Sequence, residues 1–526
     1  MTTVSLPLAG PARALRLELK RSAVPFLLPL LAAVFYYNTV RTADGFPAVW
    51  TLRASVIGDH MLFEFSAFAG GLGAWAGSRE GRRKTADLVT TTARAAWARL
   101  SIALAGTLAW LLLAFGSGVA VLYVKTALQA TWGGPPVWPV LVGAAGVTVV
   151  TVIGFTCGVL FPGRFTAPLV AVVTLFLYQV GFHAVLGIDP VPGIHGLGSG
   201  TYGLLSPAGP PPNPDAGVYY RIAPDLSVVR VMFLAGIAVA LFGMLGLAPG
   251  VRRLASPRSR GSVRAFLAHG GSWPLRGAAL VLIAGGLAAA VTAFSLAGTA
   301  RLDPVGGWEI PALHAAASDR PLPVAEDCTS VATLRVCVDQ AFSDDLSDVA
   351  DALKPVAAEI GGLPGAPAKA AEVASMDGGQ QVMSGTAGNP PVFEFTAEHV
   401  GPIFGDFNAP ADDPAQWRAP FQTGLLDAFV AGLAPGSGQH AGPAVPPAGL
   451  AAQQAVVNAL LTAAGTAPSE IGGNELLPGQ PSAATWAAIG AATRRFLALP
   501  ASARRAWLAT HLTALRAGTI TLAQVP

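Results

Sequence analysis

Long apolar runs alternate with short polar segments from the start of the chain to about residue 298. A helix needs roughly 20 apolar residues to cross a bilayer. Seven runs come close to that length, and the second is the shortest. We therefore predict seven membrane-spanning helices, at Val24–Val40, Met61–Gly77, Leu100–Val124, Val137–Phe161, Phe165–Leu186, Val228–Leu247 and Leu275–Gly298.

A basic amphipathic segment precedes the first run. In Pro11–Arg21, an apolar helical face carrying Leu15 and Leu19 has Arg16 and Lys20 beside it. This pattern favours a cytoplasmic interfacial helix over residues 1–23, lying on an anionic leaflet. A signal peptide is the competing interpretation. No small-residue cleavage site follows the first run, which favours retention of the segment.

The polar segment Ser78–Arg99 separates the second and third runs. Its charged residues cannot lie in hydrocarbon, so the segment stands in water at one membrane face. Thr85–Arg99 contains no Pro or Gly, which favours an amphipathic helix leading into the next span. The charges between positions 79 and 94 are Arg79, Glu80, Arg82, Arg83, Lys84, Asp87 and Arg94.

The basic residues indicate the orientation of the spans. With seven crossings, the N-terminus, Ser78–Arg99, Arg164 and the basic linker 249–273 share one side. The opposite loops carry fewer Lys and Arg residues. The positive-inside rule then predicts a multi-pass protein of the cytoplasmic membrane, with its N-terminus inside and residues 299–526 outside.

Composition agrees with this division. Of the 526 residues 52% are hydrophobic and only 12% are charged, and the mean hydropathy is +0.53. Up to Thr299 there are 22 Lys and Arg against 9 Asp and Glu; beyond it there are 11 against 21. A basic membrane half is therefore followed by an acidic second half. We expect an α-helical polytopic membrane protein with a six-span core at 24–248, a seventh span at 274–298 and a C-terminal α+β extracytoplasmic domain.

The predicted extracytoplasmic domain has its own pattern of elements. Thr333–Val338 and Val392–Phe395 read as strands. Ser343 is a candidate N-cap for a helix that turns Val349, Leu353 and Val356 inward and ends at Gly361–Gly362. Four more helices are predicted at Gln416–Leu433, Gly449–Ala464, Ser482–Leu499 and Ala501–Ala517.

Two cysteines, Cys328 and Cys337, lie close together in this domain. An exported domain permits a disulfide between them, which we predict. The alternative is a pair of reduced cysteines on a small strand. We expect no metal site, because neither cysteine has a histidine nearby.

Two ionisable residues lie within predicted spans. Glu64 is in the second and His183 is near the outer end of the fifth. Such residues often line a translocation path, although simple access to water at the outer interface explains them as well. The Gly- and Pro-rich outer loop 187–227 suits an ordered cap, a re-entrant hairpin or a flexible loop, and the sequence does not separate these.

Signatures of catalysis are absent from the sequence. It contains no G-x-x-x-x-G-K-[ST], no H-E-x-x-H and no G-x-S-x-G motif. We therefore predict that the chain is not an enzyme and binds no cofactor, and we expect no nucleic-acid partner.

The basic N-terminal helix, six spans and R-E-G-R-R-K-T-A-D-L-V-T-T-T after span two resemble the permeases of type-2 ABC (ABC-2) transporters. The resemblance covers about residues 10–248. The chain has Ala93 where the family usually has Pro. The Gly and Thr that usually adjoin in the family are here Gly81 and Thr85, which are separated by three residues. The tail, ending in RRAWLATHLTALRAGTITLAQVP, is similar to long outer domains of actinobacterial members. The residues assigned to the family's coupling segment are Glu80, Gly81, Arg82, Thr85, Asp87, Leu88, Thr90, Thr91 and Arg94.

The resemblance implies a permease subunit of an ABC exporter. ATP and Mg would be bound by separate ATPase subunits, and a second permease half, either another copy or a paralogue, would complete the path. Two other classes stay open. One is a membrane sensor or scaffold whose outer domain binds a ligand or partner. The other is a membrane-anchored enzyme, against which the missing catalytic set argues.

Overall fold

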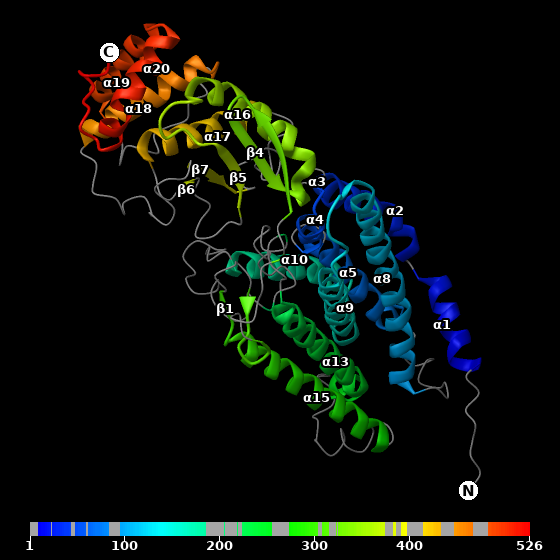
Figure 1. Cartoon of the computed structure of the whole chain (residues 1–526). Coiled ribbons are helices and arrows are strands. Elements are labelled where there is room, and N and C mark those ends of the chain that lie inside the picture. The colour runs from blue at the N-terminus through cyan, green and yellow to red at the C-terminus, as the bar shows by residue number, and fades with distance from the viewer. Residues whose placement is uncertain are drawn as a thin grey trace.

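The computed structural model describes residues 9–22, 24–43, 48–58, 62–83, 95–185, 205, 218, 223–254, 273–302, 308–314, 322, 325–373, 382–384, 391–396, 414–432, 447–466 and 482–526. Helices dominate both halves of the chain (Figure 1). The N-terminal bundle, residues 9–297, contains α1 (Ala9–Arg21), α2 (Val24–Phe35), the π-helix η1 (Tyr36–Val40), α3 (Arg41–Ala43), α4 (Trp50–Val56), α5 (Leu62–Gly77), α6 (Arg79–Arg82), α8 (Ala96–Gln129), α9 (Val137–Leu160), α10 (Thr166–Val185), α13 (Asp225–Leu254) and α15 (Trp273–Ala297).

Within the described residues, four helices are long and apolar enough to cross a membrane: Ala96–Gln129, Val137–Leu160, Asp225–Ala248 and Leu275–Ala297. Two shorter apolar helices, Val24–Phe35 and Thr166–Tyr178, correspond to the first and fifth predicted runs. Large apolar side chains on the long helices are exposed; Leu128 of α8 is 83% exposed and Val281 of α15 is 71% exposed. Such surfaces suit lipid better than water. The described residues therefore form a mostly helical protein with four candidate membrane spans, which supports a helical membrane protein.

Small residues allow the helices of the bundle to approach closely. Helix α5 runs parallel to α9: Gly73 faces the carbonyl oxygen of Thr151, and Gly77 faces that of Phe155. Helix α13 is antiparallel to α15, and a Cβ added at Gly236 would lie 2.7 Å from the carbonyl oxygen of Gly286. Backbone-to-backbone contact of this kind is a common way to associate helices in lipid, where apolar burial gives no advantage.

The C-terminal domain, residues 299–526, combines two small sheets with helices. Strands β1 (Arg301–Leu302) and β2 (Trp308–Glu309) pair antiparallel. The larger sheet has the order β3-β4-β5-β7-β6, with a parallel centre and an antiparallel strand at each edge. Its strands are β3 (Glu326–Val331), β4 (Leu334–Asp339), β5 (Lys369–Glu372), β6 (Val382–Ser384) and β7 (Val392–Phe395).

The helices of this domain are the 3-10 helix η4 (Gln340–Asp345), α16 (Leu346–Ile360), α17 (Pro414–Asp427), the π-helix η7 (Ala428–Gly432), α18 (Pro447–Ala463), α19 (Ala483–Ala498) and α20 (Ala501–Arg516). In Figure 1, α16 and α17 lie next to the sheet, and α18 to α20 gather at the C-terminal end of the molecule. The predicted α+β composition is confirmed for the described residues.

The core of the C-terminal domain forms where α16 and α17 meet the sheet. Val349, Leu353 and Val356 are buried, as their spacing predicts. Phe393 and Phe395 of β7 pack on Phe421 of α17, with ring centroids 6.1 and 5.2 Å apart. Glycine ends α16, since Gly362 adopts a positive φ of 75°.

The predicted N-cap at Ser343 is wrong. Asp339 caps η4, because its side chain accepts a hydrogen bond from the backbone N–H of Ala341 at 2.8 Å. This bond starts a 3-10 turn that contains Ser343, so α16 begins only at Leu346. The Ser343 hydroxyl instead lies within hydrogen-bonding distance of Asp327 Oδ2 and the Gln340 carbonyl oxygen.

The two halves of the molecule share apolar contacts. Val49 and Leu52, at α4, belong to the same buried cluster as the core of the C-terminal domain, and Trp132 packs against it. The Thr131 hydroxyl donates to the Gln340 carbonyl oxygen at 3.4 Å. Figure 1 shows this domain beside the end of the bundle that carries α3 and α4. It is therefore packed on the helix ends as well as joined to α15 by the chain.

Candidate functional site

Six described residues or segments form what we call the α6 corner, where α5 ends and α8 begins: Glu18, Trp75, Arg79–Arg82, Arg99, Gly106 and Pro162. Helix α6 is a single turn of four residues after α5. It occupies the start of the segment that the sequence assigns to coupling. Contacts from α1, α5, α8 and the α9–α10 connection hold it.

Glu18 and Arg79 form a two-pronged ion pair between α1 and α6. The Arg79 Nη2 and Nη1 atoms donate to Glu18 Oε1 and Oε2 at 2.7 and 2.9 Å. The hydrogen bond to Glu18 raises the pKa of Arg79 against the opposing effect of burial. Below the carboxylate, the Cβ of Glu18 packs against Gly106 of α8. The Trp110 indole N–H also donates to the Leu19 carbonyl oxygen at 3.0 Å, so α1 is fastened to α8 at two points.

Glu80 and Gly81 face two other elements. Glu80 Oε1 lies 3.8 Å from Arg99 Nε, which links α6 to the first turns of α8. Gly81 packs on Pro162, and an added Cβ would overlap the proline ring. The absence of a side chain at position 81 therefore lets α6 rest on the α9–α10 connection.

Arg82 turns back over the end of α5. Its guanidinium carbon lies 3.3 Å from the centroid of the Trp75 indole, and Nη2 donates to the Trp75 carbonyl oxygen at 2.8 Å. Burial and the neighbouring charge of Arg83 lower the pKa of Arg82. The arginine stays close to the bundle instead of extending into water.

Several predicted site residues fall outside these observations. Residues 84–94 lie outside the described part of the chain, so the assignments of Thr85, Asp87, Leu88, Thr90, Thr91 and Arg94 remain predictions. Glu64 and His183 belong to α5 and α10, but their side chains are outside the description. Their path-lining role also remains a prediction.

Sequence reasoning did not single out Glu18 or Trp75. A signal existed for Glu18, because it is the one acidic residue among the basic residues of α1. Its partner Arg79 is 61 positions away, which no local pattern reveals.

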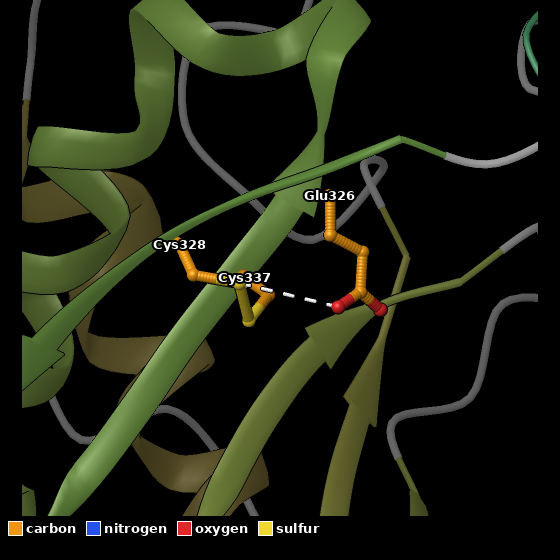
Figure 2. Close-up of side chains that lie close together, drawn as sticks. All are labelled: Glu326, Cys328 and Cys337. Carbon is orange, nitrogen blue, oxygen red and sulfur yellow. Dashed lines mark hydrogen bonds between the residues drawn. A yellow bond between two sulfur atoms is a disulfide. The ribbon is translucent and has the colours of Figure 1, made fainter.

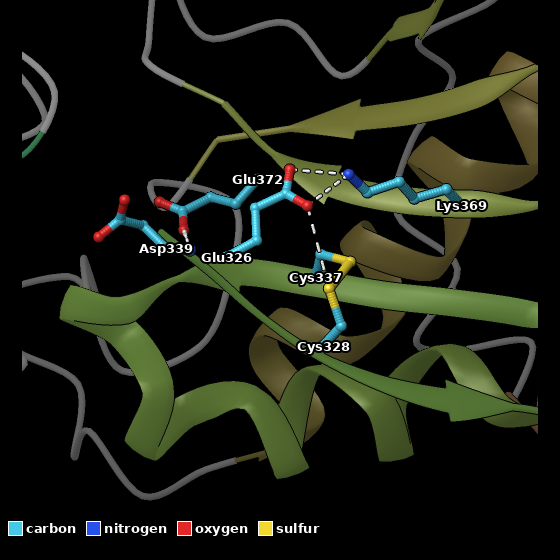
Figure 3. The surroundings of a disulfide bond; sticks show 6 residues. All are labelled: Glu326, Cys328, Cys337, Asp339, Lys369 and Glu372. Carbon is cyan, nitrogen blue, oxygen red and sulfur yellow. Dashed lines mark hydrogen bonds and ion pairs between the residues drawn. A yellow bond between two sulfur atoms is a disulfide. The ribbon is translucent and has the colours of Figure 1, made fainter. Parts of the chain in front are cut away.

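The predicted disulfide is confirmed. Cys328 and Cys337 face each other across the antiparallel β3–β4 pair and are bonded through their sulfur atoms (Figure 2). The Sγ of Cys328 lies 3.9 Å from Glu326 Oε2. Figure 3 shows the surroundings, in which Lys369 Nζ contacts both Glu326 oxygens at 2.6 and 2.7 Å.

The same group is a possible set of metal ligands in a reduced protein. The ligand atoms of Glu326, Cys328 and Cys337 lie within 4.8 Å of one another. In the structure, however, the two sulfur atoms are bonded to each other and Glu326 is held by Lys369. We therefore interpret the two cysteines as a structural disulfide. The bond cross-links a hairpin at a separation of nine residues.

Comparisons of the chain with models of protein families, with curated proteins and with solved structures found no match.

Proposed function

We propose that this chain is the transmembrane permease subunit of an ABC exporter, in which ATP hydrolysed by a separate ATPase subunit drives movement of a substrate across the cytoplasmic membrane. The observation that carries the proposal is the α6 corner. A short helix at a loop between two apolar helices is braced by ion pairs to α1 and α8 and by contact with Pro162.

The proposed topology has seven spans, with the α6 corner inside and the C-terminal domain outside. The relative directions of neighbouring helices support this topology. Strict alternation requires the second and fourth spans to be parallel and the last two to be antiparallel, as α5 with α9 and α13 with α15 are. The α6 corner and the Thr131–Gln340 contact also lie at opposite ends of the 34-residue helix α8.

The bracing provides a mechanical route. A force on residues 84–94 would reach Arg79–Arg82 directly, because the two segments are continuous. Ion pairs and close packing would then pass it to α1, α5 and α8 as one body. At the far end of α8, Trp132 and Thr131 contact the C-terminal domain. Closure or opening of the bundle at that end would therefore move this domain as well.

A sensor or scaffold is the second candidate, and the shared core favours it. Because Val49 and Leu52 are buried with the core of the C-terminal domain, a ligand bound to that domain would also displace α4. The signal would then run from the domain to the bundle.

Affinity purification of the full chain from its native membrane, followed by mass spectrometry, separates the two candidates. A stoichiometric P-loop ATPase in the eluate supports the permease. Recovery without an ATPase, in a detergent that keeps other ABC complexes intact, favours the sensor or scaffold.

A further inference from the structure

A cavity of about 220 Å³ opens beside the α6 corner. Five helices contribute to it: the end of α1, the start of α2, the last turns of α5, the short helix α6, and α8 around Gly106. Its lining divides by chemistry. Arg21, Arg79, Arg82 and Arg83 supply charge, whereas Val24, Leu72 and Ala103 supply an apolar wall.

The charges of this cavity are unbalanced. Glu18 is the acidic residue in its lining, and both of its carboxylate oxygens are engaged by Arg79. Arg21, Arg82 and Arg83 are therefore not neutralised by that carboxylate. Three guanidinium groups around one opening form a site for an anion, since guanidinium donors match phosphate oxygens.

The Arg82 guanidinium also contains an unsatisfied hydrogen-bond donor. Its Nε atom is buried and has no hydrogen-bond partner among the described residues. A buried donor without an acceptor is costly. Trp75 covers one face of the same guanidinium, and the Arg82 side chain lines the cavity.

The apolar wall indicates the source of the anion. A free phosphate ion has no apolar atoms that could pack against Val24, Leu72 and Ala103. A phospholipid has glycerol and acyl carbons directly beside its phosphate. The cavity also lies where the basic helix α1 meets the start of α2, at the boundary between a polar and an apolar segment. Basic pockets between membrane helices are known to take anionic headgroups.

We propose that this cavity binds the phosphate headgroup of an anionic phospholipid in the cytoplasmic leaflet, with Arg82 and Arg83 on the phosphate and Arg21 at the rim. The bound lipid fills the space that α1, α2, α5, α6 and α8 enclose beside the Glu18–Arg79 pair, and so helps to hold these helices together. The assignment of leaflet rests on the topology proposed above; the binding itself does not depend on an ATPase partner.

The test measures lipid retention by the full-length protein. The purified chain is stripped of lipid in detergent, titrated with dioleoylphosphatidylglycerol or dioleoylphosphatidylcholine, and analysed by native mass spectrometry. The expected result is saturable binding of one phosphatidylglycerol per chain, at concentrations where phosphatidylcholine does not bind. In Arg82→Gln and Arg83→Gln variants the affinity should fall about fivefold for each arginine removed.

Two variants complete the comparison. Arg164→Gln removes an exposed charge in the α9–α10 connection, outside the cavity lining, and should leave binding unchanged. Arg21→Gln acts at the exposed rim, so it provides a weakened variant even if changes at Arg82 impair folding.

Three results would overturn the proposal. The first is equal binding of the two lipids. The second is unchanged phosphatidylglycerol binding in folded Arg83→Gln and Arg21→Gln proteins. The third is full displacement of the lipid by inorganic phosphate, which would make the cavity a site for a free anion. A missing ATPase in the purification experiment would contradict the exporter but would not change these lipid measurements.

Discussion

Asp345 should make the C-terminal domain less stable at neutral pH than in mild acid. It lies at the N-cap position of α16, and its side chain makes no capping hydrogen bond. Burial, together with the charges of Asp348 and Asp344, raises the pKa of Asp345 from 3.8 to about 6. Between pH 3.8 and about 6 the folded protein therefore holds a proton on Asp345 that the unfolded chain releases, and above about pH 6 the folded protein carries the unfavourable charge.

The size of the effect follows from the two pKa values. The difference between about 6 and 3.8 corresponds to about 3 kcal/mol. This 3 kcal/mol is the cost of ionising Asp345 in the folded protein. The N-terminus of α16 favours a negative charge by up to ~1 kcal/mol, so the net cost of the charge is about 2 kcal/mol. Because the pKa of Asp345 is raised in the folded protein, the stability that protonated Asp345 contributes to the folded state is fully present below pH 3.8. It is lost as the pH rises through about 6.

Asp345→Asn removes the charge, so it should raise the free energy of unfolding by about 2 kcal/mol at pH 7.5. For a domain of this size that is a rise of roughly 4–8 °C in the unfolding midpoint. The assay is thermal unfolding of the full chain in detergent, followed by tryptophan fluorescence between pH 4 and pH 8. The gain over wild type should shrink towards pH 4.

The matched control is Asp351→Asn, an exposed aspartate of the same helix, which should show a much smaller pH-dependent gain. A gain from Asp345→Asn that is the same at every pH would refute the reasoning, because it would have a cause other than ionisation.

Three further predictions concern packing, the disulfide and coupling. Gly81→Val should destabilise the bundle by about 1–3 kcal/mol, because the new side chain overlaps Pro162; Gly277→Val, where an added Cβ meets nothing within 4 Å, is the control in the same thermal assay. Replacing both Cys328 and Cys337 with Ser should cost about 2–3 kcal/mol, and a reducing agent should lower the midpoint of the wild type but not of the double variant. Glu80→Ala or Asp87→Arg should leave membrane insertion intact while separating ATP hydrolysis from transport in reconstituted vesicles. Loss of insertion in these two variants would make the segment a folding element.

Much of the local structure could be predicted from the sequence. The predicted helix at Ser482–Leu499 appears as α19, Ala483–Ala498, with the Ser482 hydroxyl accepting from the Thr485 N–H at 3.2 Å. Apolar periodicity also identified Val349, Leu353 and Val356 as core residues. These features depend on neighbours within one or two turns, which a sequence pattern contains.

Features that depend on distant residues could not be predicted. The cap at Asp339 coincides with the last residue of β4, so finding it requires knowing where the strand ends in the sheet. The Glu18–Arg79 pair and the contact of Gly81 with Pro162 join helices that are far apart in the chain. The cavity beside the α6 corner arises from that packing, so no spacing of arginines alone would have revealed it.

The central claim is that residues 84–94, next to the α6 corner, dock on an ATPase. The most direct measurement is site-specific crosslinking in native membranes, with a photoreactive residue at Thr85, Leu88 or Thr91 and a control at Phe165, which is exposed on the α9–α10 connection. The proposal predicts crosslinks to one P-loop ATPase from the first three positions and none from Phe165. Crosslinks only to lipid or to this chain itself, in membranes where the protein is functional, would contradict it.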